Sequence, residues 1–316
     1  MKKIIALVLA LSLCLGMVAA TAVAEDKLPK IAFLGPISTH AWVSGITYQA
    51  NEHLVKLAGE GKLEYKIYSS SNAEEMTTQM DEAILWGCDA MILAPQWTGM
   101  EVPVQAAVEQ GIVVVNFDID IAVDGVYKVT GDNYSMGAES AKYIVERVGQ
   151  EGIVVALPVP TSGSVSDLRM QGFNDTIKEI APNLTVLEYA SAFTRDAGLA
   201  DMADILVANP QIDAVFSLDD ETSIGALQAI IEQGRTDIKA ITGGGGCQEY
   251  FGMMTDEAYA NIWVSSATYA PNMIVNCIEN AVAVLNGETV ENSIVLATNL
   301  VDRDNVADFL NADSPY

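Results

Sequence analysis

The sequence predicts an α/β fold built from two similar lobes, each containing a parallel sheet. Short apolar runs of strand length alternate along the chain with longer stretches whose apolar residues recur at helical spacing. This alternation is typical of parallel sheets with right-handed crossovers. One strand–helix unit also recurs. The run that starts at Asp89 precedes a helix ending in Glu-Gln-Gly111, and a similar run that starts at Asp213 precedes a helix ending in Glu-Gln-Gly234. The repeat indicates a duplicated α/β lobe.

In the first half of the chain, each predicted strand is a short apolar run bounded by turn residues. Asn72 and Glu75 form a capping box at the start of one helix, and Gly87 ends that helix. The run 112–117 is apolar throughout, as expected for a strand that is buried on both faces. We expect strands at 30–35, 63–68, 89–95, 112–117 and 127–130, and helices at about 45–59, 72–87 and 96–110.

A second set of elements begins at Gly131. Its central strand, 213–218, ends at the carboxylates Asp219 and Asp220, and ligands of open α/β sheets bind beyond the carboxyl ends of strands. Thr222 or Ser223 is expected to cap the helix that follows. We expect helices at 135–149, 167–180, 195–208, 222–233 and 271–286, strands at 153–157, 184–189, 213–218, 238–242, 260–264 and 294–297, and loops at 158–166 and 243–246.

The composition is that of a globular, acidic protein. Of its 316 residues, 50% are hydrophobic, and the formal net charge is −26. A chain of this length has room for one large domain or for two lobes. The negative field opposes binding to nucleic acid and to anionic membrane surfaces, because both are negatively charged. A neutral small molecule is not excluded as a ligand.

The segment 1–24 has the pattern of a signal peptide. A basic start is followed by the apolar run 4–20 and by the small-x-small site Ala22-Val23-Ala24. We therefore expect export to the periplasm or to the outer face of the cell membrane. A lipid anchor at Cys14 is the less favoured alternative, because Leu13 stands where such signals carry a small residue. No later run is long and apolar enough to span a membrane, so the mature protein is not expected to span one.

The expected mature chain keeps Cys88, Cys247 and Cys277, whose odd number and scattered spacing do not form a disulfide framework. Cys88 and Cys277 fall in apolar segments and are interpreted as core residues, whereas Cys247 follows four glycines and is expected to be exposed. No His lies near any of them in the sequence, so a nucleophilic role is not favoured. Neither a metal-ligand cluster nor a phosphate-binding loop is present, so no cofactor and no metal is expected.

Several motifs occur in a fixed order along the chain. They are Asp89-Ala-Met-Ile-Leu-Ala-Pro95, Gly111-Ile-Val-Val-Val-Asn-Phe-Asp118, Gly131-Asp-Asn-Tyr-Ser-Met-Gly137, Arg169-Met-Gln-Gly-Phe173 and Asp219-Asp-Glu-Thr-Ser-Ile-Gly-Ala226. Over nearly the whole mature chain, this ordered set resembles the type I periplasmic solute-binding proteins of the ribose/galactose group, which includes the substrate-binding proteins of sugar ABC transporters. An export signal, and no DNA-reading helix-turn-helix, precedes the motifs.

The resemblance implies two Rossmann-like parallel-sheet lobes joined by a three-strand hinge, with the ligand in the cleft between the lobes. The chain crossings of the hinge are expected near Gly131-Asp132, Ser265–Thr268 and Leu296–Thr298. We expect a signal peptide at 1–24, a first lobe at 27–131 plus 267–295, and a second lobe at 132–266 plus 296–316.

Sugars are bound by aromatic rings that stack on their apolar faces and by planar charged or amide groups that pair with their hydroxyls. The ligand-binding residues that the resemblance implies are His40, Trp42, Asp118, Arg169, Phe193, Asp219, Gly244 and Thr268. Trp42 would provide a stacking surface and Arg169 a fork of donors toward two hydroxyls. The alternatives are ordinary structural roles: His40 as an exposed turn residue and Trp42 as a core residue at a helix start. Trp97 and Tyr269 are expected at the rim.

The segment Gly243–Gly246 is the largest departure from the family pattern, which has Gly-Phe-Asp-Gly there. Ile119 is a second departure, since the family often has Arg. The glycines would make room for a larger ligand, present backbone N–H groups to it, or simply form a flexible turn. Both departures put ribose itself in doubt and leave a hexose, a polyol, a cyclitol, a nucleoside or a small oligosaccharide open.

Three functions follow from these observations. The first is a solute receptor, expected to be monomeric, that delivers a sugar or polyol to the permease of an ABC importer. The second is a sensory module that presents its closed form to a chemoreceptor or a receptor kinase. The third is an enzyme, which the sequence disfavours because it has two His, no nucleophile elbow and no metal-ligand cluster.

Overall fold

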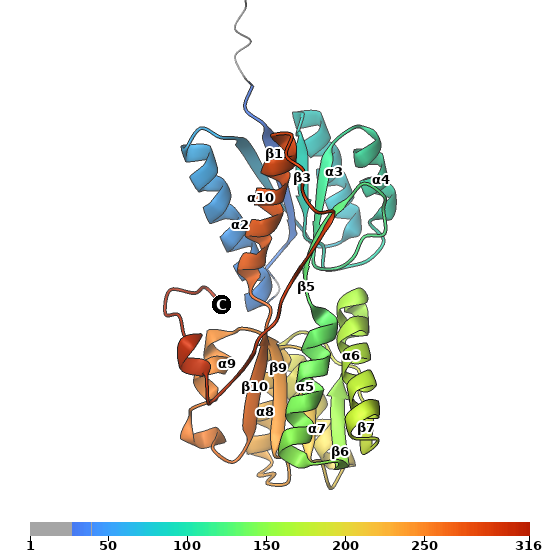
Figure 1. The fold of residues 1–316 in the computed structure, drawn as a ribbon, viewed down its shortest axis with the longest axis vertical. Coiled ribbons are helices and arrows are strands. Elements are labelled where there is room, and N and C mark those ends of the chain that lie inside the picture. The colour runs from blue at the N-terminus through green and yellow to red at the C-terminus, as the bar shows by residue number, and fades with distance from the viewer. Residues whose placement is uncertain (1–26, 39) are drawn as a thin grey trace, which may run out of the picture.

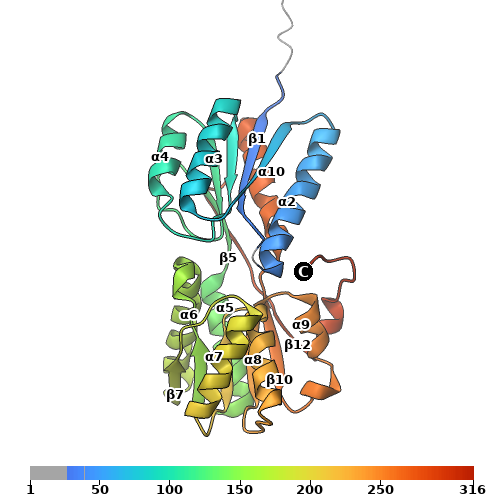
Figure 2. The same cartoon turned by 180° about the vertical axis from the view of Figure 1, so that it is seen from behind.

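The computed structural model describes residues 27–38 and 40–316. The expected signal peptide and Cys14 lie outside the described residues. Two lobes are stacked along the long axis of the molecule, and in each lobe helices cover both faces of a central sheet (Figure 1; Figure 2). Within the part of the chain that is described, no helix has the length and hydropathy needed to cross a membrane.

The first lobe is built on a six-stranded, fully parallel sheet with the order β11-β5-β4-β3-β1-β2. Helices α2 and α10 cover one face of the sheet, and α3 and α4 cover the other. The bounds are β1 Lys30–Pro36, α2 Ala41–Gly59, β2 Glu64–Ser70, α3 Ala73–Trp86, β3 Ala90–Leu93, α4 Glu101–Glu109, β4 Val113–Phe117, β5 Tyr127–Gly131, α10 Ile274–Leu285 and β11 Ser293–Leu296.

The second lobe is built on a six-stranded sheet with the order β12-β10-β9-β8-β6-β7, in which only β12 is antiparallel. Helices α5 and α6 lie on one face, and α7, α8 and α9 lie on the other. The bounds are α5 Asn133–Val148, β6 Glu151–Leu157, α6 Ser164–Ile180, β7 Asn183–Glu188, α7 Arg195–Ala208, β8 Ala214–Ser217, α8 Asp220–Glu232, β9 Ala240–Gly245, α9 Gln248–Met253, β10 Trp263–Thr268 and β12 Leu300–Asp302, with short 3-10 turns at Pro160–Ser162, Glu257–Tyr259, Pro271–Met273 and Val306–Asp308.

The two sheets have the same strand order, which is the arrangement that a duplicated lobe predicts. The order reverses direction between β1 and β3 in one lobe and between β6 and β8 in the other. Such a switch point leaves a crevice beyond the carboxyl ends of the strands, where open α/β sheets bind ligands. The carboxyl ends of both sheets face the space between the lobes, because β5 and β10 run toward the crossings (Figure 1).

The chain crosses between the sheets at three places: after β5, after β10, and between β11 and β12. The crossings are joined to one another by hydrogen bonds. The backbone N–H of Asp132 donates to the carbonyl of Leu296 at 2.9 Å, and Thr268 and Asn299 bond to each other through their backbones and through the Thr268 hydroxyl. We propose these crossings as the lobe boundaries, close to the expected divisions after residues 131, 266 and 295.

Glycines allow close packing of two helix pairs in the second lobe. A Cβ atom on Gly137 of α5 would lie 1.9 Å from the Arg169 carbonyl oxygen, and a Cβ atom on Gly172 of α6 would lie 2.0 Å from the Tyr134 carbonyl oxygen. In the other pair, a Cβ atom on Gly198 of α7 would lie 2.2 Å from the Thr222 carbonyl oxygen, and a Cβ atom on Gly225 of α8 would lie 2.1 Å from the Arg195 carbonyl oxygen. Because these obstacles are backbone atoms, both pairs can pack this closely only with glycine at these positions.

Several expected details are confirmed and others are corrected. Asn72 caps α3 by accepting from the Glu75 N–H, and α7 has the expected bounds. The expected cap of α8 was wrong, because Asp219 accepts from the N–H groups of Glu221 and Thr222. The expected glycine loop was also wrong, since Gly243–Gly245 completes β9 and pairs with β10. Strand β10 begins three residues later than expected, and β12 was not anticipated.

Candidate functional site

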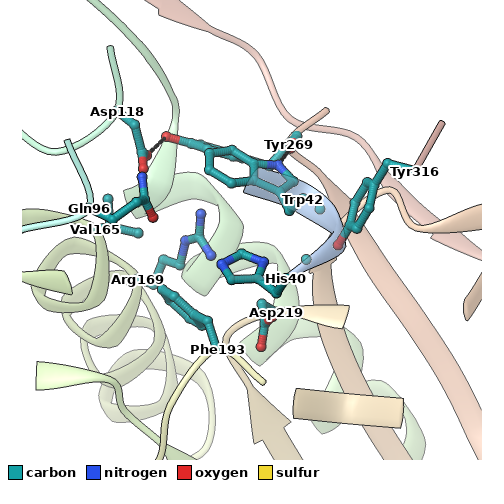
Figure 3. Close-up of a pocket in the computed structure, with 12 residues that line it drawn as sticks. His40, Trp42, Gln96, Asp118, Val165, Arg169, Phe193, Asp219, Tyr269 and Tyr316 are labelled. Atoms are coloured by element: carbon teal, nitrogen blue, oxygen red, sulfur yellow. Dashed lines mark hydrogen bonds between the residues drawn. The ribbon is translucent and has the colours of Figure 1, made fainter. Parts of the chain in front are cut away.

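The pocket between the lobes is lined by residues that follow the carboxyl ends of strands (Figure 3). It encloses about 370 Å³ including its open mouth. The first lobe contributes His40, Trp42, Gln96 and Asp118; the second lobe contributes Val165, Arg169, Phe193, Asp219, Gly244 and Gly245; Tyr269 follows β10 at a crossing, and Tyr316 belongs to the segment that follows β12.

Asp118 lies directly after β4 and has a left-handed backbone conformation, with a φ of 71°. It is the only non-glycine among the described residues with positive φ, and such local strain is concentrated at functional sites. Its carboxylate accepts a hydrogen bond from the Tyr269 hydroxyl at 2.5 Å (Figure 3). Burial raises the pKa of Asp118, although Tyr269 and Arg169 act in the opposite direction. The site therefore holds a desolvated carboxyl group beside the pocket.

Arg169, on α6, is only 4% exposed and is held in a fixed position. Its Nε donates to Asn133 Oδ1 at 2.8 Å, and its Nη1 donates to the Leu218 carbonyl at 2.7 Å. The guanidinium carbon lies 4.7 Å from the ring centroid of Tyr269 and 5.9 Å from that of Phe193. These two bonds use two of the five N–H groups of a guanidinium. Arg169 is thus preorganised to donate further hydrogen bonds to a ligand.

Trp42, on α2, connects the pocket to the core of the first lobe. Its ring is stacked on Phe117 with centroids 6.0 Å apart, and its Nε1 donates to the Tyr269 carbonyl at 2.7 Å. It is 8% exposed, so a large part of the ring is packed against protein and an edge remains at the pocket. Both roles considered for Trp42, core residue and pocket wall, apply.

His40 and Asp219 lie at the starts of α2 and α8. Burial lowers the pKa of His40, which keeps its imidazole neutral near pH 7, and its buried Nδ1 has no hydrogen-bond partner within the described residues. The Asp219 carboxylate caps α8 by accepting from Thr222 at 3.1 Å and from Glu221 at 3.2 Å. Burial raises the pKa of Asp219 to about 6. Both groups present polar atoms to the pocket from positions fixed by helix starts.

Seven of the eight residues expected at the site line this pocket, and Thr268 does not. Its hydroxyl accepts from the Asn299 N–H at 2.8 Å, so Thr268 stabilises the chain crossing. Of the two residues expected at the rim, Tyr269 lines the pocket, whereas Trp97 packs against the core beside α3 and α4. Whether the seven bind a ligand stays a prediction.

The sequence reasoning missed three residues of the pocket wall, Gln96, Val165 and Tyr316, and considered Gly245 only as part of the segment Gly243–Gly246. Gln96 follows β3 at its carboxyl end, so the rule that pointed to Asp219 also applies to it. Tyr316 carries no such signal, because no strand or motif places it near the cleft.

Cys247 was expected to be exposed, and this expectation was wrong. It is 4% exposed, because Gly243–Gly245 form a strand and the next turn packs inward. Burial raises the pKa of its thiol to about 12 and that of Cys88 to about 11. Among residues 27–38 and 40–316, no group of His, Cys, Asp and Glu side chains is arranged to hold a metal ion.

The sequence is similar to a known protein family and to several curated proteins. Residues 31–289 match the family described as periplasmic binding protein domain. The D-allose-binding periplasmic protein of Escherichia coli K12 is 30% identical over 156 residues, covering 46% of this chain and 50% of the relative. The xylitol-binding protein of Mycolicibacterium smegmatis is 30% identical over 182 residues, covering 55% and 52%. The chain thus spans about half the length of the curated relatives it matches.

Solved structures show the same fold over almost the whole chain. An ABC transporter solute-binding protein from Mycobacterium smegmatis with bound glycerol superposes with a TM-score of 0.82 at 24% identity, covering 91% of this chain and 98% of that one. A galactofuranose-binding protein superposes with a TM-score of 0.80 at 23% identity, covering 91% and 100%.

Proposed function

We propose a function from one premise: the chain belongs to the family of periplasmic binding protein domains. We infer that it is an extracytoplasmic solute-binding protein, which captures a sugar or a polyol between its lobes and delivers it to the permease of an ABC importer. The observation that carries this inference is the pocket itself, because side chains from both lobes converge on one small space.

Convergence from both lobes matters for the mechanism. A ligand that contacts Trp42 and Asp118 on one lobe and Arg169 and Phe193 on the other favours the closed arrangement over an open one. It can shift the equilibrium only by its difference in affinity for the two states. Closure about the hydrogen-bonded crossings would then be the signal that an importer reads.

The chemistry of the pocket suits a polyhydroxylated ligand. Buried carboxyl groups, a preorganised guanidinium and a neutral imidazole can pair with hydroxyls, and aromatic rings can cover the C–H faces of a sugar. The names of the curated relatives include D-allose-binding, xylitol-binding and ribose import binding proteins, which agree with such a ligand. We therefore propose a sugar or polyol of about monosaccharide size.

A thermal-shift screen of the chain without residues 1–24 tests the function. The panel contains D-allose, D-ribose, xylitol, D-galactose, myo-inositol and adenosine. A ligand at 100 times its dissociation constant adds about 2.7 kcal/mol to the free energy of unfolding, a readable shift. The expected result is that at least one sugar or polyol stabilises the protein. Arg169→Lys should weaken the affinity for that ligand at least tenfold. Leu85→Ala, a control at an exposed side chain of α3, should leave the affinity unchanged. Silence across the sugars and polyols would refute the proposal.

Family membership also supports a role without catalysis, since the matched relatives are named as binding proteins. We propose that the mature protein acts as an exported monomer whose partner is a permease. Capture of partners from detergent-solubilised membranes with the ligand-bound protein tests this. Recovery of an ABC permease is expected, and recovery of a receptor kinase or chemoreceptor in its place would assign the protein a sensory role.

A further inference from the structure

We propose that Tyr316 is a specificity-determining residue, which closes one end of the pocket and restricts it to ligands of monosaccharide size. This inference rests on the proposed sugar-binding function and names the side chain that sets the length of the ligand. We call residues 306–316 the strap, because they run from the second lobe back to the cleft, between α9 and the N-terminal start of α2 (Figure 1; Figure 2).

The strap is attached to the second lobe through α9. Gln248 donates to the Phe309 carbonyl at 3.3 Å and accepts from the Asn311 N–H at 2.7 Å, and the Phe251 and Phe309 rings meet edge to face at 6.4 Å. Tyr316 is 6% exposed at the far end of this attachment. The strap therefore places Tyr316 in the cleft as a fixed side chain.

Tyr316 also lies against the first lobe. A Cβ atom built on Gly45 of α2 would lie 3.5 Å from the Cβ atom of Tyr316, an ordinary van der Waals distance. The ring thus fills the gap between α2 and the end of β9. In the close-up it closes the side of the pocket opposite Asp118 and Gln96 (Figure 3).

The wall at the end of β9 has no side chain that could close the pocket, because it consists of Gly244 and Gly245. A Cβ atom on Gly245 would lie 2.7 Å from the Tyr316 hydroxyl oxygen and 3.2 Å from its Cε1. The ring and a side chain at residue 245 therefore compete for one space. The glycines, which the sequence analysis expected to make room for a larger ligand, to present backbone N–H groups or to form a turn, here leave room for an aromatic ring from a distant part of the chain.

A second cavity begins on the other side of the same ring. It encloses about 730 Å³ including its mouth. It is lined by Gly246, Gln248, Phe251 and Thr268, by Phe309, Asn311 and residues 313–316 of the strap, and by Gln49 and residues 270–272. Tyr316 lines both spaces and so separates them. Without the ring, the pocket would continue into this second cavity, which has room for a second sugar unit.

The test compares monosaccharides with disaccharides. Wild-type protein, Tyr316→Phe, Tyr316→Ala and Leu310→Ala, a control at an exposed residue of the strap, are titrated with D-allose, D-ribose, xylitol, maltose and lactose in a calorimeter. We expect the wild type to bind at least one of the first three and neither disaccharide. Tyr316→Phe should keep this preference, since the ring remains. Tyr316→Ala should shift the ratio of disaccharide to monosaccharide affinity at least tenfold toward the disaccharide, and Leu310→Ala should not.

An unchanged ratio in Tyr316→Ala, with a wild type that binds monosaccharides, would overturn the inference and leave the proposed function standing. A wild type that binds none of these ligands and neither D-galactose nor myo-inositol would overturn both, and a wild type that binds a disaccharide would overturn the inference alone. Gly245→Ala provides a second readout that does not depend on ligand. Its loss of thermal stability should be at least partly relieved in the Gly245→Ala/Tyr316→Ala double variant, because the methyl group and the ring then no longer collide. Additive losses would contradict the competition for space.

Discussion

The buried carboxyl group of Asp220 should make the stability of the protein depend on pH between 5 and 8. Its Oδ2 accepts from the N–H groups of Gly246 and Cys247 at 2.8 Å each and from the Ser266 hydroxyl at 2.9 Å. Its Oδ1 has no hydrogen-bond partner within the described residues, and the side chain is fully buried. Replacing Asp220 by Asn keeps the shape and an acceptor oxygen but removes the charge.

The size of the effect follows from the pKa of this group. Burial is the largest cause that raises the pKa of Asp220 from 3.8 to about 7, and the neighbouring Asp219 adds to it. A carboxyl group whose pKa is raised by folding stabilises the native state below its unfolded pKa and loses this contribution as pH rises through the folded pKa. Between pH 5 and pH 8, the loss from this one group amounts to roughly 3 kcal/mol.

Urea unfolding at pH 5, 6, 7 and 8 of the wild type and Asp220→Asn measures this difference. The wild type should lose roughly 3 kcal/mol more than the variant as pH rises from 5 to 8. Asp219 is present in both proteins, but replacing Asp220 also removes the repulsion between the two carboxylates, so the comparison measures the effect of the Asp220 charge together with its coupling to Asp219. Parallel stability curves for the two proteins would refute the assignment of a protonated Asp220.

Three further predictions concern packing, the pocket and the thiols. Gly172→Ala should destabilise the protein by about 3 kcal/mol in urea unfolding, because the new methyl group meets backbone, whereas Gly59→Ala, in α2 with open space around it, should be neutral or stabilising by up to about 1 kcal/mol. Asp118→Asn should weaken ligand binding at least tenfold, as measured by calorimetry, without changing the fold, because asparagine tolerates the positive φ of this position. An unaltered affinity would show that Asp118 does not bind the ligand. Cys247 should react with a thiol reagent at pH 8 at least tenfold more slowly in native than in urea-unfolded protein, and equal rates would contradict its burial.

The two-lobe α/β architecture was predictable because its signals are local. Apolar strands such as 113–117 and capped helices such as α3 carry their own pattern, and ligand sites of parallel sheets lie at strand ends. The strand-end rule therefore predicted Asp219 at the cleft, the family resemblance added Asp118, and both line the pocket.

The errors arose where local signals conflict with tertiary packing. Because glycine is a poor strand former, the local sequence predicts a loop at Gly243–Gly246. In the structure, pairing with β10 extends β9 to Gly245. Asp219 is as good a helix cap as Thr222, and local sequence alone does not choose between them. Tyr316 could not be predicted from the sequence, because its place depends on how the strap runs from the second lobe back to the cleft.

The three crossings also constrain the order in which the protein can be completed as it is synthesised. In the first lobe, β11 forms one edge of the sheet, and α10 covers the face formed by β3, β4 and β5. In the sequence, however, both α10 and β11 come after β10, and thus after most of the second lobe. A chain that stops before residue 274 leaves the buried side chains of Val115, Phe117 and Val129 without the residues of α10 that pack on them. The first lobe therefore cannot reach its native state as an independent N-terminal fragment, and products truncated before α10 expose apolar surface to chaperones and proteases.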